Sequence, residues 1–281
     1  MKGIVLATGT DPRLHPITLA VPQHLLPVGD KPMIYYPLSV LMLAGIRDIL
    51  VIASPSDAYQ RLLGDGSQLG LRVDYAEQPE RDGVAEALLT GADHIGTDQV
   101  ALILGDTLLP GPAILRDAAR NVDGCVLFGE PSTGLYLYDG DVVDIVKNLR
   151  RPAHGQPEIT DVNQVYRRQG RARLIRGFAR LDASTPDSLI RAGQYVRAVE
   201  QRHGQRIACV EEVALRMGFI TAAQCYRLGA RQSNSPYGQY VMRAAAITPP
   251  RRPARTHLAR SAGTASPAGQ RPHRTVAAPP P

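Results

Sequence analysis

Short apolar runs that alternate with segments of helical character cover the first hundred or so residues of this 281-residue chain. The apolar runs are 3–7, 48–53, 71–77 and 100–104, and the helical segments between them are 35–43, 55–63 and 84–92. Strands that alternate with helices of this length are typical of βαβ units, in which helices cover both faces of a parallel sheet. The pattern therefore predicts an α/β fold with a Rossmann-like, mostly parallel sheet and helices on both faces.

The pattern changes after residue 110, where helices become more frequent. We expect short strands at 125–128 and 134–138, one or two more within 172–181, and helices at 139–148, 160–169, 184–202, 210–217, 221–229 and 237–245. The longest of these helices is supported by apolar residues at helical spacing. The sequence shows no internal repeat, so we expect one domain over residues 1–243 with a helical C-terminal part.

The formal net charge of +6 comes from the end of the chain. Residues 247–281 carry six arginines and no acidic residue, so residues 1–246 are balanced, and this stretch also holds eight of the 23 prolines. Such a composition without apolar periodicity is typical of a disordered tail. The balanced body argues against a nucleic-acid-binding domain, whereas the tail could contact nucleic acid or an acidic partner, or simply stay solvated.

The cysteines and the apolar runs suggest a compartment. No run approaches the roughly 18 consecutive apolar residues that cross a bilayer, and the run at 3–7 is too short for a secretory signal. The chain has an odd number of cysteines and no CxxC pair, which disfavours a disulfide framework or a zinc site. The three cysteines are Cys125, Cys209 and Cys225. We therefore expect a cytoplasmic protein without a membrane segment.

Two loops of the predicted sheet carry the residues best suited to chemistry. Ligands of an open parallel sheet bind beyond the carboxyl ends of the strands, near the point where the strand order reverses. The loop after the first strand contains Gly9, Thr10 and Arg13, and Asp106 follows the strand at 100–104. Backbone N–H groups of a glycine-containing loop cradle phosphates, and arginine binds them bidentately. The loop lacks a GxGxxG motif, so an NAD-dependent Rossmann protein is disfavoured.

The order of short motifs along the chain resembles that of the sugar-1-phosphate nucleotidylyltransferases. Gly9, Arg13-Leu14, Pro16 and Leu25-Leu26-Pro27 keep the frame of that family's first loop, and 30–38 is similar to the glucose-1-phosphate thymidylyltransferase branch. Further segments similar to that branch follow in the family's order at 62–68, 78–79, 82–83, 104–106, 158–163, 181–182 and 237–240. The resemblance therefore extends from residue 1 to about residue 243.

This resemblance implies transfer of a nucleotidyl group from dTTP to glucose 1-phosphate, giving dTDP-glucose and pyrophosphate for deoxysugar or antibiotic biosynthesis. Arg13 and Asp106 are then the candidate catalytic residues, and Asp106 and Asp182 are the candidate ligands of Mg²⁺, which prefers oxygen donors. The candidate substrate-binding residues are Gly9, Thr10, Gln23, Gln78, Gly83, Glu130 and Glu158. The family pattern also implies a homo-oligomer, with a homotetramer as the expected form.

Several departures from the family's pattern bear on activity. Asp11 and Pro12 interrupt the first loop, and Gln23 stands where the family has a lysine. Proline has no N–H to offer a phosphate, and Asp11 brings a negative charge beside a polyanion. Only 129–133 remains of a longer segment that contacts the sugar phosphate, and Arg180 replaces the usual tryptophan. An alternative is therefore a catalytically silent homologue that binds nucleotide or partners an active relative.

Each candidate side chain also has a purely structural interpretation that the sequence leaves open. It could cap a turn or a helix start, or form a surface salt bridge. This applies to Asp106, Asp182, Arg13, Gln78, Gly83 and Glu158. His15 and His24 lack a partner at catalytic or ligand spacing, so we expect them to be structural or exposed.

Overall fold

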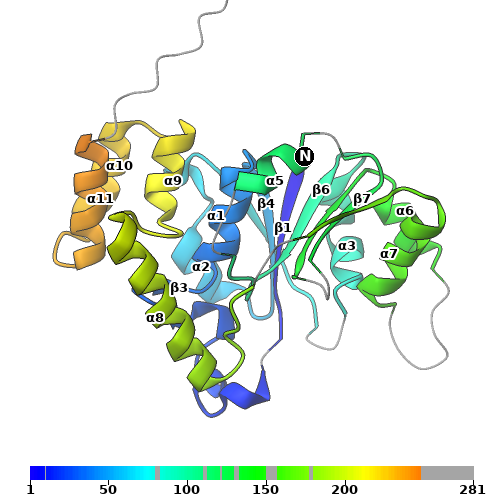
Figure 1. The fold of residues 1–281 in the computed structure, drawn as a ribbon, viewed down its shortest axis with the longest axis horizontal. Coiled ribbons are helices and arrows are strands. Elements are labelled where there is room, and N and C mark those ends of the chain that lie inside the picture. The colour runs from blue at the N-terminus through cyan, green and yellow to red at the C-terminus, as the bar shows by residue number, and fades with distance from the viewer. Residues whose placement is uncertain are drawn as a thin grey trace, which may run out of the picture. The chain divides into compact units, whose positions relative to one another are not determined.

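Seven strands form one sheet in the computed structural model, which describes residues 1–9, 11–79, 83–109, 113–120, 122–129, 133–149, 157–176 and 180–247 (Figure 1). In spatial order they are β5 (Arg72–Ala76), β4 (Asp48–Ala53), β1 (Lys2–Ala7), β6 (Val100–Leu104), β8 (Leu135–Tyr138), β7 (Cys125–Phe128) and β9 (Ala172–Ile175). Only β8 runs against the others, because it is antiparallel to both β6 and β7. The predicted mostly parallel sheet is confirmed.

The strand order reverses next to β1. β1 pairs with β4 on one side and with β6 on the other, and Leu6 is level with Ile52 and Leu104. The chain runs outward from β1 through β4 to β5 and then returns to place β6 on the opposite side of β1. The carboxyl ends of β1 and β6 therefore flank the switch point, where open α/β sheets bind their ligands.

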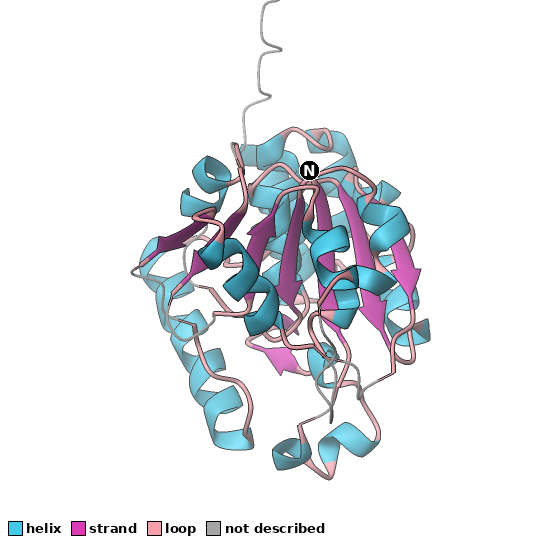
Figure 2. Cartoon of the chain, turned by 90° about the vertical axis from the view of Figure 1, so that its right-hand side faces the viewer, coloured by secondary structure: helices cyan, strands magenta, loops and turns pink. Residues whose placement is uncertain are grey.

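Helices cover both faces of the sheet (Figures 1 and 2). One face packs against α1 (Tyr35–Leu43), α2 (Asp57–Leu63), α5 (Ala113–Ala118) and α9 (Val210–Met217). The other face packs against α3 (Glu86–Thr90), α4 (Ala92–Ile95), α6 (Val142–Lys147) and α7 (Ile159–Arg168). The predicted arrangement of helices on both faces is therefore confirmed.

The sequence of β1 explains how both faces can be packed. Val5 and Ala7 belong to one core, whereas Ile4 and Leu6 belong to the other, and all four side chains are buried. Successive side chains of a strand point to opposite faces, so an unbroken apolar run serves two cores at once. Full burial of an Ile or Leu side chain contributes about 1.5–3 kcal/mol.

A third core lies beside the carboxyl end of the sheet. It joins α8 (Pro186–His203) to a two-stranded ribbon formed by β2 (Pro27–Val28) and β3 (Lys31–Pro32). Val196 of α8 belongs to this core together with Leu108, which follows β6, and Ala183. The segment that enters α8 is thereby packed next to the segment that leaves β6.

Two further helices complete the helical C-terminal part. α10 (Ala222–Ala230) and α11 (Pro236–Ile247) pack against each other and against α9. Their backbones approach closely, because a Cβ on Gly229 would lie 2.8 Å from the carbonyl oxygen of Gly238. Glycine at this contact therefore allows the two helices to meet.

Several elements differ from the sequence-based expectation. The helix expected at 84–92 is divided into α3 and α4 at Gly91, where a Cβ would lie 2.7 Å from Ile4 Cδ1. The helix expected at 139–148 begins only at Val142, because Asp139 accepts hydrogen bonds from the N–H groups of Gly124 and Asp141. β9 is the only strand within the described part of 172–181. The β2–β3 ribbon and α5 were not predicted.

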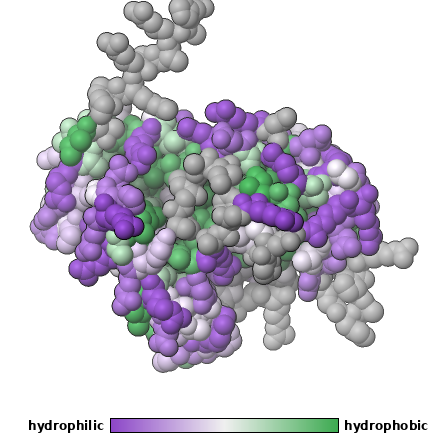
Figure 3. Space-filling model, in the orientation of Figure 1, coloured by the Kyte–Doolittle hydropathy of each residue, from purple (hydrophilic) through white to green (hydrophobic). Residues whose placement is uncertain are grey.

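The face drawn in Figure 3 carries mainly hydrophilic residues, with small apolar areas between them. The large apolar side chains that are exposed are Ile17, Leu19, Val21, Ile190, Tyr195, Tyr226 and Ile247. No helix among the described residues is long and apolar enough to cross a membrane. The tail predicted beyond Ile247 lies outside the described residues, as do Thr10 and Glu130.

Candidate active site

The segments that follow β1 and β6 lie side by side at the switch point. The N–H of Gly105 donates to the carbonyl oxygen of Leu6 at 2.8 Å, so the end of β6 stays joined to the end of β1. Asp106 comes next in the chain, and 23% of its side chain is exposed. This carboxylate therefore lies at the edge of the sheet where ligands of this fold class bind.

An isolated antiparallel bridge brings Asp182 to the same edge. The N–H of Leu181 donates to the carbonyl oxygen of Leu108 at 3.0 Å, which sets the segment around Asp182 alongside the one around Asp106. Asp182 accepts hydrogen bonds from the Oγ and the N–H of Ser184 at 2.7 and 3.1 Å. These bonds, with the bond from Ser184 Oγ as the largest cause, lower the pKa of Asp182, and the charge of Arg180 lowers it further. Asp182 is therefore ionised at neutral pH.

Arg180 forms an ion pair with Asp106. Its Nη2 donates to Asp106 Oδ2 at 3.0 Å, and both side chains are about three-quarters buried. The charge of Arg180 also lowers the pKa of Asp182, so Arg180 acts electrostatically on both candidate metal ligands. The sequence had identified Arg180 only as a departure from the family's tryptophan, and nothing in the pattern predicted this pairing.

Arg13 is held within its own loop by Asp11. Its Nη2 lies 2.6 Å from Asp11 Oδ2, and its Nε donates to the same carboxylate at 3.0 and 3.1 Å. The hydrogen bonds from Arg13 lower the pKa of Asp11, and the same contact raises the pKa of Arg13. The charge of Asp182 raises the pKa of Arg13 as well, which places Arg13 within electrostatic reach of Asp182.

Gln23 supports the loop that carries Arg13. Its Oε1 accepts the N–H of Asp11 at 2.8 Å, and its side chain is buried. Gly9 enters this loop with φ +87°, and a Cβ at Gly9 would lie more than 4 Å from the atoms of the other described residues. Gln23 therefore orders the loop by accepting a backbone hydrogen bond, which a lysine cannot do.

His24 lies beneath Asp106 and is structural. Its Nδ1 is 3.2 Å from the hydroxyl of Tyr59, which in turn donates to the carbonyl oxygen of Ala7 at 3.4 Å. A Cβ on Gly105 would lie 2.6 Å from the His24 ring. Burial lowers the pKa of His24 to about 4, although the charge of Asp106 opposes the shift. The neutral ring is a rigid support for the chain at Asp106.

A second group of candidate residues gathers where β5, α3 and α7 meet. The Nε2 of buried Gln78 donates to the carbonyl oxygen of Gly83 at 3.2 Å, and a Cβ on Gly83 would lie 3.5 Å from the carbonyl oxygen of Pro157. Glu158 follows and begins α7, with its N–H bonded to Asp161 and its carboxylate accepting from Thr160. The structure thus brings Gln78, Gly83 and Glu158 together, and Glu158 caps a helix.

A pocket of about 920 Å³ lies away from the switch point. It is lined by α8, by the turn between β2 and β3 and by Tyr240 of α11, and includes Gly29, Arg197 and Glu200. Glu200 is already paired with Lys31, whose Nζ lies 2.9 Å from Glu200 Oε1. We therefore base the site on the charged residues at the sheet edge and not on this groove.

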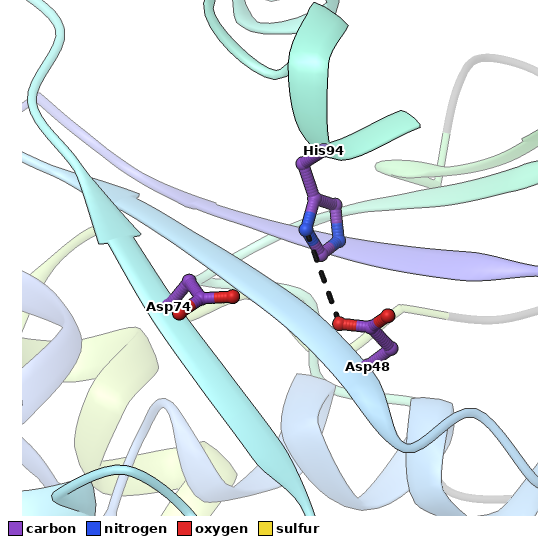
Figure 4. Close-up of side chains that lie close together, drawn as sticks. All are labelled: Asp48, Asp74 and His94. Atoms are coloured by element: carbon purple, nitrogen blue, oxygen red, sulfur yellow. Dashed lines mark ion pairs between the residues drawn. The ribbon is translucent and has the colours of Figure 1, made fainter. Parts of the chain in front are cut away.

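Asp48, Asp74 and His94 form the group of metal-ligand side chains that stands out in the described part of the chain (Figure 4). One ligand atom from each lies within 4.8 Å of the others. However, Asp48 is already bound by Lys2 and by Arg72, whose Nε donates to it at 3.0 Å. Because Asp48 is the first residue of β4, the cluster lies at the amino end of the parallel strands, about 15–20 Å from the end that carries Asp106. It is therefore separate from the candidate site.

Comparison with known proteins assigns the class of this fold and site. Residues 2–123, which hold both switch-point loops, match the Nucleotidyl transferase family. A UDP-glucose pyrophosphorylase solved with UDP-glucose has the same fold, with a TM-score of 0.58 over 70% of this chain and 98% of that one, at 20% identity. The chain therefore has the fold of this pyrophosphorylase, and its first 123 residues match the nucleotidyl transferase family model.

Closer relatives define the family. The chain is 44% identical to the glucose-1-phosphate thymidylyltransferase of Mycobacterium tuberculosis strain H37Rv, over 86% of this chain and 98% of the relative. It is 42% identical to that of Neisseria meningitidis serogroup A, over 86% and 99%. A Bacillus anthracis structure assigned to the same activity and solved with sucrose gives a TM-score of 0.65 at 31% identity, over 70% and 95%. The chain belongs to the glucose-1-phosphate thymidylyltransferase family.

Proposed function

We propose that this chain transfers a thymidylyl group from dTTP to glucose 1-phosphate, giving dTDP-glucose and pyrophosphate. The observation that supports the proposal is that backbone hydrogen bonds join the segment before Asp106 to β1 and the segment before Asp182 to Leu108, at the switch point of this fold. In this reaction a phosphate oxygen of the sugar attacks the α-phosphorus in line, a new P–O bond forms, and the α–β P–O bond breaks. Pyrophosphate then leaves with the electrons of that bond.

The residues at the switch point suit these steps. Gly9 and its loop would receive the triphosphate, and Arg13 would neutralise the charge that develops on the leaving pyrophosphate once it is released from Asp11. Asp106 and Asp182 offer carboxylate oxygens from neighbouring segments, the donor type that Mg²⁺ prefers. The metal ion would supply charge neutralisation of the phosphate oxygens. Thr10, from the same loop, would add a contact to the triphosphate.

The second group of residues suits recognition of the base and the sugar. We assign Gln78 and Gly83 to the thymine side of the site, because the buried Gln78 amide donates to the carbonyl oxygen of Gly83 and so holds the two residues together. We assign Glu158 to the sugar, since it adjoins Gly83 through Pro157. Glu130 would complete the sugar side. Gln23, which orders the phosphate loop, would act on the substrate through that loop.

A shortened sugar pocket supports the alternative of a silent homologue. The alignment with the Mycobacterium tuberculosis enzyme spans 282 positions, whereas 86% of 281 residues is about 242, so about 40 positions of the relative have no counterpart here. This supports a missing segment near 129–133. The ion pairs Asp11–Arg13 and Arg180–Asp106 engage two residues that substrate needs. A binder of nucleotide without turnover is therefore the second candidate.

Pyrophosphate release separates the two candidates. Purified protein is incubated with glucose 1-phosphate, dTTP and Mg²⁺, beside Asp106→Asn and a matched Asp117→Asn control, whose carboxylate on α5 is 78% exposed. Turnover that survives in the control and is lost in Asp106→Asn supports the enzyme. Absence of turnover with dTTP-induced thermal stabilisation supports the silent binder. The absence of both turnover and stabilisation would contradict both candidates.

The biological setting follows from the proposed reaction. We propose that the dTDP-glucose feeds deoxysugar or antibiotic biosynthesis, since a nucleotide-activated hexose is a precursor of modified sugars. We propose a cytoplasmic location, supported by three buried cysteines that form no disulfide. We also propose a homo-oligomer, with a tetramer as its form, in which exposed Leu19 and Ile190 are covered. The catalytic domain would comprise 1–243 and the tail 247–281.

A further inference from the structure

Arg180 is bound to Asp106, a carboxylate that we propose as a ligand of the divalent cation. It donates from Nη2 to Asp106 Oδ2 at 3.0 Å, and its backbone directly precedes Leu181, which is bonded to Leu108. The two carboxylates proposed to bind Mg²⁺ therefore flank a segment that already presents a permanent positive charge. Arginine does not lose this charge at accessible pH.

The surrounding contacts favour a cation that can be displaced. The Arg180 side chain is 28% exposed, and the contact to Asp106 is a single hydrogen bond rather than a bidentate one. By contrast, Arg171 contacts both Asp139 and Asp141 and lies over the ring of Tyr166. Arg180 is thus tied to Asp106 by charge and by one bond, and it can turn toward solvent or toward a bound phosphate.

Two positive charges bound to the same carboxylate repel each other strongly in a partly buried site. A divalent ion bound to Asp106 and Asp182 would lie beside the Arg180 guanidinium. Either the ion or the guanidinium can satisfy Asp106, but their joint presence is unfavourable unless an anion enters between them. A nucleoside triphosphate supplies such an anion, because its phosphates accept hydrogen bonds from arginine and also bind the metal.

We propose that Arg180 is a resident cation that competes with the divalent metal for Asp106, so that metal binds weakly to the free protein and tightly only together with the triphosphate. This rests on the proposed function only in taking Asp106 and Asp182 as the metal ligands. Arg180 is then a positioning residue that makes metal entry depend on nucleotide. In the free protein Arg180 neutralises Asp106 without a bound ion.

Binding of Mn²⁺ to the free protein, followed by electron paramagnetic resonance, tests the proposal without turnover. Arg180→Gln removes the competing charge and keeps a polar side chain, and it should bind Mn²⁺ at least tenfold more tightly than the unaltered chain. Arg180→Lys keeps the charge and should bind as weakly as the unaltered chain. Asp106→Asn combined with Arg180→Gln should lose the gain. Arg227→Gln, on the exposed surface of α10, removes the same formal charge elsewhere and should change nothing.

The result that overturns the proposal is equal Mn²⁺ affinity of the unaltered chain and Arg180→Gln. Equal thermal melting curves of Arg180→Gln and Arg180→Lys establish that the comparison is between folded proteins. If Arg180→Lys raises the affinity for Mn²⁺ as much as Arg180→Gln does, the charge argument is also contradicted. The outcome is independent of catalysis. Tighter Mn²⁺ binding without pyrophosphate release upholds this proposal and rejects the enzyme, whereas turnover with unchanged Mn²⁺ affinity does the reverse.

Discussion

Asp11 holds the guanidinium of Arg13 through both carboxylate oxygens, with Nη2 2.6 Å from Oδ2 and Nε 3.0 Å from Oδ1. The same carboxylate accepts the N–H of Arg13 at 2.9 Å and so caps the short helical turn at 12–14. An acid that the sequence suggested would repel phosphate is thus, in the free protein, the partner of the arginine expected to bind phosphate. A triphosphate that takes the donors held by Asp11 must first separate this pair.

Asp11→Asn should strengthen nucleotide binding. Asparagine keeps the side-chain acceptor at the turn and is as good a cap as aspartate, but it releases Arg13 and removes a negative charge beside the triphosphate. We expect dTTP to bind about fivefold more tightly or better in calorimetric titration, since a nearby charge repulsion is lost. Asp65→Asn is the matched control, because Asp65 makes the same turn contact with Ser67 at the far end of α2. Unchanged affinity in Asp11→Asn would contradict the pairing argument.

Gln23→Lys tests whether Gln23, in place of the family's lysine, does no more than remove a positive charge. Gln23 accepts the N–H of Asp11 and is 6% exposed, so a lysine there leaves that N–H without its partner. The single variant should be destabilised by about 1–3 kcal/mol in urea unfolding. Combined with Asp11→Gly, which frees the loop and Arg13, it should raise pyrophosphate release. Turnover that stays equal or falls in the double variant would count against this account of the loop.

His24 should make stability depend on pH. Its pKa is about 4 in the folded protein because of burial, whereas it is about 6.5 in the unfolded chain. Between these values the unfolded state binds more protons, so stability is full above pH 6.5 and falls as pH drops toward 4. The loss should approach about 3 kcal/mol at the acid end. Urea unfolding at pH 7 and pH 5 checks this, and His24→Gln should lose less stability between these two pH values than the unaltered chain.

Buried strands could be predicted from the sequence because each is one apolar run of the right length. β1, β4 and β6 match their runs to within a residue, and α9 matches its predicted range. The β2–β3 ribbon could not be predicted in this way, since each of its strands is two residues long and its stability comes from packing on α8. Local pattern thus predicted the sheet, and tertiary contact determined the rest.

The candidate site could likewise be predicted from the sequence only in part. Gly9 and Asp106 follow predicted strands, so their place at the sheet edge follows from topology. The pairing of Asp11 with Arg13 and of Arg180 with Asp106 does not, because both depend on side-chain directions within irregular loops. Opposite charges two residues apart are common, and Arg180 is 74 residues from Asp106. No spacing rule relates such positions.

Gly105→Ala should disturb the site without touching a charged residue. A Cβ at this position would lie 2.6 Å from Cδ2 of His24 and 3.0 Å from its Cγ. The His24 ring is fully buried and held by Tyr59, so it cannot move aside cheaply. Such overpacking should cost about 1–3 kcal/mol in urea unfolding. Because Asp106 follows directly, dTTP and Mn²⁺ binding should weaken as well.

The clash can be separated from a general intolerance of alanine in these loops. Gly83→Ala is the control, because among the described residues its Cβ would meet the carbonyl oxygen of Pro157 at 3.5 Å, an ordinary contact, and stability should change by no more than about 0.5 kcal/mol. His24→Ala removes the ring that Gly105→Ala strikes. If the clash causes the loss, the double variant should be more stable than the sum of the two single effects predicts, by about 1 kcal/mol or more. Strict additivity would show that Gly105 is needed for another reason than room for His24.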